Sequence, residues 1–121
     1  MSGMSGMTAL AQAPTPKTIN ELKAFYQQNC VRCHGTDGSA QSPEGKKLGG
    51  QDFTKAAQDF RALTGPASER ELRAMARTIQ KGLFFGFSMP AWKDKLSEED
   101  ATFMAREVLL KAERGKAIKP D

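Results

Sequence analysis

The chain has 121 residues, of which 39% are hydrophobic, 7% aromatic and 26% charged, and its net charge is +4. This length suits a single domain with a thin core, which usually needs a disulfide, a metal or a cofactor for stability. No apolar run reaches the roughly 18 residues of a membrane helix, and no basic block is interleaved with aromatic residues, so neither a membrane span nor nucleic-acid binding is expected.

Residues 1–17 are predicted to be a flexible tail, a leader remnant or a tag. Ala11-Gln12-Ala13 is similar to the end of a signal peptide, but a positive start and an apolar stretch of adequate length are missing. The domain could also have been cut from a larger protein. The thioethers of Met1, Met4 and Met7 have a spacing that could bind Cu(I), although a tail rich in Ser and Gly is the favoured interpretation.

The first predicted helix begins at a capping box, Thr18-Ile19-Asn20-Glu21, and runs into the motif Cys30-Val31-Arg32-Cys33-His34. This motif holds both cysteines and the only histidine of the chain. Its pattern, C-x-x-C-H, is that of covalent attachment of a c-type haem. Each thiol can add to one vinyl group of the porphyrin, and a ring nitrogen of the histidine can then bind the iron. We therefore expect one haem c, attached through Cys30 and Cys33 and bound by His34.

Two other kinds of site use the same residue types. A structural zinc site usually needs four ligands, whereas the motif offers three. A thiol oxidoreductase usually carries C-x-x-C at the start of a helix in a βαβ unit, whereas here the motif ends a helix. Both alternatives are therefore less favoured than a haem.

Residues 35–50 contain five glycines and Pro43, and this composition predicts a loop that can wrap a flat ligand. Leu48 and Phe53 are the expected inward anchors of this loop. Such a segment would not form a core unaided.

Three further helices are predicted. The first covers about residues 54–63, the second runs from a capping box at residues 68–71 to Gly82, and the third begins at Ser97. Because no alternating strand pattern occurs, we predict an all-α fold of about four helices, joined by glycine-rich loops around one covalent haem.

A second axial ligand must come from a residue other than histidine. Met75 and Met104 lie on apolar helical stripes, where core packing is the simpler explanation. Met89 instead precedes Pro90 in a segment rich in Gly and Phe, and the proline disfavours a helix at that point. We predict that Met89 is the second ligand, since His and Met recur together in haem proteins. A hydrophobic loop without a metal role is the alternative.

The chain resembles class I cytochromes c of the small bacterial type. The shared features are Tyr26, the motif at residues 30–34, the glycine-rich loop, Met89-Pro90-Ala91-Trp92 and a closing helix. The resemblance implies a cytochrome c domain over residues 18–113, with residues 114–121 as a C-terminal tail. It also implies haem contacts from Tyr26 and Phe103, and a loop carbonyl behind the proximal histidine, for which Pro43 is the candidate. The indole N–H of Trp92 suits a haem propionate or a backbone carbonyl.

The expected function is one-electron transfer between redox proteins. His and Met together leave no easily vacated iron position, which favours an electron carrier over an enzyme. A haem enzyme or gas sensor would need a labile Met89, and the chain has no distal histidine. An electron-entry domain of a larger oxidase or of a copper-delivery protein is a further alternative.

Redox partners with acidic docking surfaces are expected, and the protein itself is expected to be a monomer. Lys46, Lys47, Lys81 and Lys93 could flank the haem cleft and meet such partners, although solvated surface is the alternative for each. Phe84, Phe85 and Phe87 could wall off the methionine side of the haem, or simply pack. The resemblance implies a periplasmic location, either free or tethered to the inner membrane through a parent protein.

Overall fold

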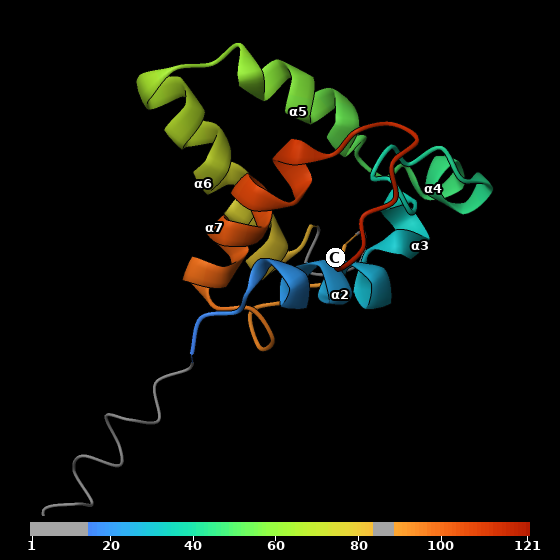
Figure 1. The fold of residues 1–121 in the computed structure, drawn as a ribbon, viewed down its shortest axis with the longest axis horizontal. Coiled ribbons are helices and arrows are strands. Elements are labelled where there is room, and N and C mark those ends of the chain that lie inside the picture. Colours follow the sequence, from blue (N-terminus) through green and yellow to red (C-terminus); the bar gives the residue numbers. More distant parts are fainter. Residues whose placement is uncertain (1–14, 84–88) are drawn as a thin grey trace, which may run out of the picture.

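The structure of the chain is a computed structural model that describes residues 15–83 and 89–121. These residues form six α-helices and one 3-10 turn, arranged around a common core (Figure 1). Within the described residues, the only β-type pairing is a single bridge between Leu83 and Met89. The predicted all-α fold is therefore confirmed.

Helix α2 (Ile19–Asn29) begins at the predicted capping box, in which Thr18 and Glu21 each accept a hydrogen bond, through the side chain, from the other residue's amide. A single turn, α3 (Val31–His34), follows after Cys30. It ends at Gly35, where φ is +82°, a value that disfavours residues with a side chain. The C-x-x-C-H motif therefore lies on a short turn between a capped helix and a glycine.

Helix α4 (Pro43–Leu48) lies within the segment that the sequence predicts to be a loop. Ser42 caps it by accepting a hydrogen bond from the amide of Gly45, and Pro43 occupies the first turn, where its missing N–H is not needed. The prediction of an uninterrupted loop over residues 35–50 is therefore wrong. Leu48 is 49% exposed and lines the cavity described below, whereas the predicted burial of Phe53 is confirmed at 5% exposure.

Helix α5 (Phe53–Arg61) is capped by Asp52, and α6 (Gly65–Lys81) follows after a short turn. The predicted capping box at residues 68–71 is wrong, because α6 begins earlier and the Ser68 hydroxyl donates to the carbonyl of Gly65 within its first turn. The predicted end of this helix at Gly82 is confirmed.

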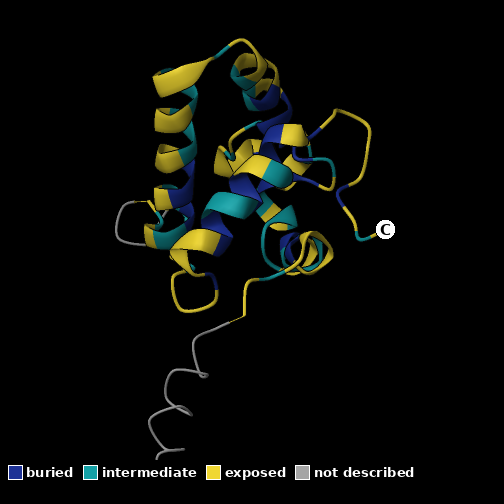
Figure 2. Ribbon diagram, turned by 60° about the vertical axis from the view of Figure 1, so that its left-hand side comes forward, coloured by how far each residue is buried: buried dark blue, intermediate teal, exposed yellow. Residues whose placement is uncertain are grey.

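Helix α7 (Glu98–Glu107) begins at Ser97 as predicted, where the hydroxyl accepts a hydrogen bond from the amide of Asp100. A 3-10 turn, η1 (Leu109–Lys111), follows it. Helix α7 packs against both α2 and α6, and η1 packs against α5. Figure 2 shows that α6 turns its buried residues inward and its exposed residues outward. The largest fully buried side chains are Tyr26, Leu22, Leu96 and Met104.

Residues 112–121, which we call the C-terminal strap, return across the domain. Ile118 is buried, and its amide donates to the carbonyl of Thr36 at 2.8 Å. The amide of Asp121 donates to the side-chain oxygen of Asn20 at 3.1 Å, so that the C-terminus lies beside α2 (Figure 1). The domain boundaries at residues 18 and 113 stay a prediction. No helix in the described part of the chain has the length and apolar character needed to cross a membrane.

Candidate haem-binding site

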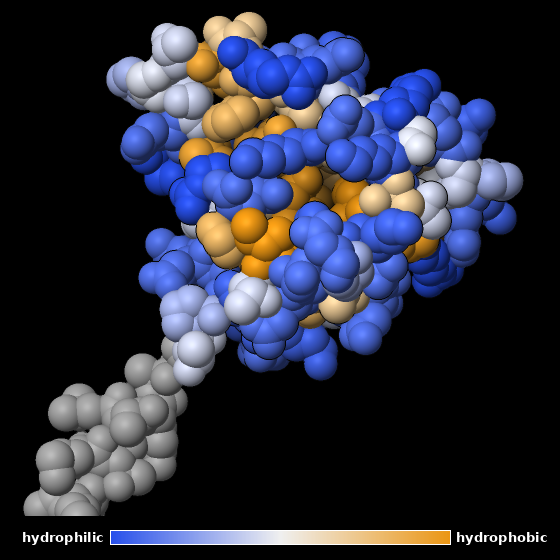
Figure 3. Space-filling view, in the orientation of Figure 1, coloured by the Kyte–Doolittle hydropathy of each residue, from blue (hydrophilic) through white to orange (hydrophobic). Residues whose placement is uncertain are grey.

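A cavity of about 310 Å³ lies between α3, α6 and the segments that follow these helices. Its lining includes Cys30, Cys33, His34, Met89 and Trp92, all of which the sequence predicts to bind the haem. The rest of the described lining is mostly apolar, with Asn29, Gln51, Glu71 and Thr78 as its polar members. Figure 3 shows apolar residues gathered near the centre of one face and bordered by hydrophilic ones. The fold therefore brings five predicted site residues, 62 positions apart at the extremes (92 − 30), to one cavity.

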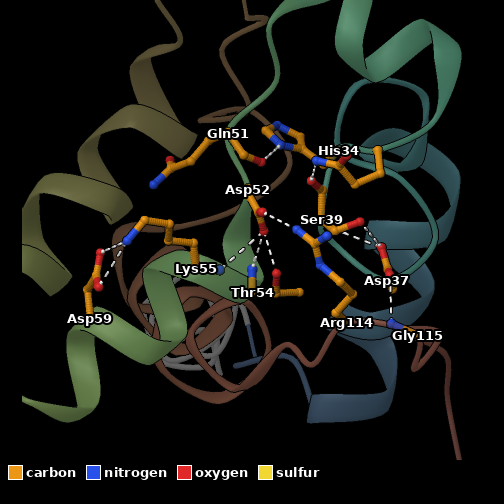
Figure 4. Close-up of polar contacts among 11 residues, drawn as sticks. His34, Asp37, Ser39, Gln51, Asp52, Thr54, Lys55, Asp59, Arg114 and Gly115 are labelled. Atoms are coloured by element: carbon orange, nitrogen blue, oxygen red, sulfur yellow. Dashed lines mark hydrogen bonds and ion pairs between the residues drawn. The ribbon is translucent and has the colours of Figure 1, made fainter.

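His34 is buried, and its ring is held on two sides. The Nδ1 atom lies 3.0 Å from the carbonyl oxygen of Gln51, as drawn in Figure 4, which leaves Nε2 as the nitrogen available to a metal. The ring also stacks on Phe53, with centroids 4.3 Å apart. Burial lowers the pKa of His34, and the hydrogen bond to Gln51 opposes this only in part, so the neutral, metal-binding form is favoured.

The carbonyl behind the histidine comes from Gln51 and not from Pro43. Pro43 instead begins α4, and the chain reaches the Nδ1 atom of His34 only after this helix has ended. No sequence signal could have identified Gln51, because every residue carries a backbone carbonyl and only the path of the chain decides which one is used.

Cys30 and Cys33 are both half-buried and are not joined by a disulfide. Burial, followed by the neighbouring Cys33, raises the pKa of Cys30 to about 12, so its thiol is held in the protonated form. The backbone around Cys33 is closely packed: a Cβ atom placed on Gly50 would lie 2.1 Å from the Cys33 carbonyl oxygen, and one on Gly45 would lie 2.8 Å from it. Two glycines are therefore needed where α4 and its C-terminal end pass the haem motif.

Met89 is half-buried and lines the cavity from the segment between α6 and α7. Its carbonyl oxygen accepts a hydrogen bond from the amide of Leu83 at 3.0 Å. At Gly82, φ is +71°, and a Cβ atom there would lie 2.3 Å from the same oxygen. The position of Met89 thus depends on a close backbone approach that glycine permits, whereas the sequence pattern indicates Gly82 only as a helix end.

Met75 also lines the cavity, from α6, and is 7% exposed. Two thioethers, those of Met75 and Met89, therefore line the cavity among the described residues. The helical spacing of Met75 predicts a core position but does not show that its side chain also faces the cavity. Glu71 is the only charged side chain among the described lining residues. Sequence periodicity places it on α6 but gives no reason to expect it at the cavity wall.

The other predicted contacts are placed differently. Trp92 lines the cavity and packs edge-on against Phe25, with centroids 5.4 Å apart. Tyr26 is fully buried and does not line the cavity in the described structure; its hydroxyl donates to the carbonyl of Gly35 at 2.6 Å. Burial raises the pKa of Tyr26, with smaller effects from Cys30 and Asp37, so this hydroxyl stays protonated as a donor.

Phe103 is half-buried against the core and carries the guanidinium of Arg106 over its ring, 5.6 Å from the centroid. Haem contacts by Tyr26, Trp92 and Phe103 stay predictions. Several predicted residues lie outside the described parts of the chain, namely Phe84, Phe85, Phe87, Met1, Met4 and Met7. The four lysines proposed for partner docking, Lys46, Lys47, Lys81 and Lys93, are all exposed.

The donor set in the cavity fits a c-type haem. It provides two thiols three positions apart, a neutral imidazole oriented through Nδ1, and soft thioethers. The walls are mostly aliphatic and aromatic, as a flat apolar ring requires.

Comparison with known proteins identifies the family of the chain. A family model described as "Cytochrome C oxidase, cbb3-type, subunit III" matches residues 17–106. A curated relative, "Cytochrome c55X" of Paracoccus denitrificans (strain Pd 1222), is 32% identical over 109 residues, which cover 88% of this chain and 85% of the relative. No solved structure matches the chain. Because the family match spans three quarters of the sequence, including the motif at residues 30–34 and Met89, the chain belongs to this family of small monohaem cytochromes c, which transfer electrons through haem c.

Proposed function

We propose that this protein carries single electrons between redox proteins through one haem c, attached covalently to Cys30 and Cys33 and ligated by His34 and Met89. The observation that carries the proposal is that these four side chains line one cavity. When bound, the haem supplies a one-electron Fe(II)/Fe(III) couple. The protein holds both ligands in place, excludes water and leaves no ligand position open to a substrate.

Each ligand has a physical role in this proposal. His34 donates from Nδ1 to the Gln51 carbonyl, which fixes the ring and makes Nε2 a stronger electron donor. The neutral thioether of Met89 favours the ferrous state and so raises the reduction potential. The aliphatic wall, including Ile79 and Leu109, acts in the same direction because it disfavours extra charge at the metal.

Redox proteins are the partners that the family implies, and cytochrome c domains are typically extracytoplasmic. We further propose a periplasmic location, free or tethered, and a cytochrome domain over residues 18–113. Acidic partner surfaces would meet the lysines near the cavity, of which Lys46 and Lys47 are in the last turn of α4. Electron transfer that slows as salt rises would support this docking, because salt screens exposed charges.

The family description favours one second candidate. It names a subunit of a cytochrome oxidase, and that supports an electron-entry domain acting within an oxidase assembly. Purification from native membranes separates the two candidates: a free carrier elutes alone after a salt wash, whereas an entry domain stays with the oxidase.

Optical spectra of the purified protein in both oxidation states test the haem and its ligands. We expect c-type bands that survive acid–acetone extraction, with a low-spin, six-coordinate pattern in both states. Met89→Ala should convert the iron to a high-spin form that binds CO. Met75→Ala is the matched control, because it removes the other thioether of the cavity and should keep the low-spin spectrum.

Three results would contradict the proposal. Extraction of the haem by acid–acetone would exclude covalent attachment. A wild-type spectrum that is already high-spin would exclude two strong ligands. Loss of the low-spin spectrum in Met75→Ala but not in Met89→Ala would assign the thioether ligand to α6.

A further inference from the structure

The Gln51 carbonyl that contacts His34 lies between two residues that are both held by the fold. Before it, the amide of Gly50 donates to the carbonyl of Gly45 at 3.1 Å, and Gly50 lies close against the Cys33 carbonyl. After it comes Asp52, whose Cα belongs to the same peptide group as the Gln51 carbonyl. Whatever holds Asp52 therefore also orients the oxygen that accepts the hydrogen bond of the histidine.

The Asp52 carboxylate joins the start of α5 to the C-terminal strap. Its Oδ1 atom accepts hydrogen bonds from the amides of Thr54 and Lys55 at 2.9 and 3.2 Å. Its Oδ2 atom accepts one from Nη2 of Arg114 at 3.0 Å, across 62 positions of the sequence. Figure 4 shows the Gln51–His34 contact and the Asp52–Arg114 contact side by side.

The residues of the C-terminal strap that follow Arg114 are held by hydrogen bonds and by burial. Directly after it, the amide of Gly115 donates to Oδ2 of Asp37 at 2.8 Å, and Asp37 is itself held by the amide of Ser39 at 2.9 Å. Further on, Ile118 is buried and its amide donates to the Thr36 carbonyl at 2.8 Å. The strap is therefore bonded to the loop that directly follows the haem motif.

We propose that Asp52 and Arg114 are positioning residues for His34: their ion pair, anchored by the C-terminal strap, keeps the Gln51 carbonyl on the Nδ1 atom of that ligand. This inference rests on the proposed role of His34 as an axial ligand. A firmly held carbonyl makes the imidazole a better electron donor and stabilises the ferric state. Loosening the ion pair should therefore raise the reduction potential and expose the Nδ1 proton to exchange.

The test uses the haem-loaded protein and the variants Asp52→Asn, Arg114→Gln and the double variant. Asparagine retains the capacity to cap α5, so Asp52→Asn mainly removes the ion pair. Lys55→Gln is the control, because it removes a positive charge from the first turn of α5 and breaks only the exposed pair with Asp59. Two quantities are measured: the reduction potential, and the exchange rate of the His34 Nδ1 proton by NMR of the reduced protein.

Positioning and simple charge effects predict opposite results for Arg114→Gln. If the ion pair positions the carbonyl, both single variants raise the reduction potential, and the double variant has the same potential as either one. Exchange of the Nδ1 proton then becomes about two- to fivefold faster in all three variants, because a partly exposed ion pair contributes up to about 1 kcal/mol. If only charge matters, Asp52→Asn raises the potential, Arg114→Gln lowers it, the shifts add and exchange is unchanged. Either that pattern or unchanged values in all three variants would overturn the proposal.

Failure of the proposed function would be seen separately. A wild-type protein without a low-spin spectrum would show that the proposed pair of His34 and Met89 does not ligate the iron, before any variant is compared. Exchange in Lys55→Gln should equal that of the wild type; an equal acceleration there would overturn the specific role of Asp52 and Arg114.

Discussion

The carbonyl oxygen of Met89 lies 3.0 Å from the amide nitrogen of Leu83, so that the two ends of the segment carrying the proposed thioether ligand are bonded to each other. The same oxygen faces Gly82, the residue that ends α6. The longest helix of the domain and the ligand segment thus meet at one backbone contact, and this contact can be tested by substitution.

Gly82→Ala should displace Met89. A Cβ atom would lie 2.3 Å from the Met89 carbonyl oxygen at a φ of +71°, and we expect a loss of about 1–3 kcal/mol in the free energy of unfolding. Optical spectra should show a larger high-spin fraction. Gly65→Ala is the control, because φ there is +55° but no atom lies within 4 Å of the added Cβ. A Gly82→Ala protein with an unchanged spectrum would show that Met89 does not depend on this contact.

Gly50→Ala should impair loading of the haem. An added methyl group would lie 2.1 Å from the Cys33 carbonyl oxygen, so the chain after α4 must move away from the motif. Overpacking of this kind costs about 1–3 kcal/mol. The ratio of attached haem to total protein after expression should fall, whereas in Gly49→Ala, where the added atom meets open space, the loss should be smaller. Equal ratios in the two variants would contradict the steric explanation.

Glu71→Gln should raise the reduction potential. Glu71 is the only charged residue among the described lining residues of the cavity, and a negative charge there stabilises the ferric state. Redox titration measures the effect, which should shrink as salt rises. Glu69→Gln on the same helix is the control, since that residue is exposed and pairs with Arg73. A shift of the same size in both variants would mean that the position of Glu71 at the cavity wall gives its charge no special effect on the potential.

Asp37 should contribute to stability in a defined pH range. Slight burial raises the pKa of Asp37, but hydrogen bonds from the Gly115 amide and from Ser39 outweigh it and lower the pKa below its ordinary value. A carboxyl with a lowered folded-state pKa stabilises the fold above its unfolded pKa, and this contribution is lost as the pH falls through the folded value. Asp37→Asn should therefore reduce the unfolding free energy at pH 7.

The difference in unfolding free energy between Asp37→Asn and the wild type should become smaller below about pH 4, the ordinary pKa of an aspartate. Denaturant unfolding at several pH values measures it, and Asp94→Asn, at an exposed position, serves as the control. A difference that stays constant down to pH 2 would show that the ionised carboxylate is not what matters.

Local signals explain the parts of the fold that were predicted correctly. Thr18 and Ser97 cap their helices through contacts within three residues, and Gly82 ends α6 by its own backbone conformation. Such interactions depend on neighbouring residues only, so their pattern is visible in the chain. Pro43 shows the limit of this reasoning, because the same residue breaks a helix in its interior and begins one in its first turn.

Long-range contacts explain what was missed at the site. Gln51 acts through its backbone carbonyl, which has no residue signature. Arg114 meets Asp52 across 62 positions, and nothing local to either residue points to the other. Met75 has the spacing of a core residue and also faces the cavity. The residues proposed to attach and ligate the haem are thus predicted from the sequence, whereas the groups that orient them depend on the folded path of the chain.

The contact between Asn20 and Asp121 has a consequence for how the domain can be joined to others. Residue 121 is bonded to the first turn of α2, so a short linker could join the end of the C-terminal strap to the start of that helix. A circular permutant that links residue 121 to residue 18 through a few glycines, and opens in the exposed turn between α5 and α6, should fold with its haem cavity intact. The new ends of such a permutant would lie at the turn between α5 and α6. A fusion partner joined there would be attached to a different face of the domain from one joined near α2.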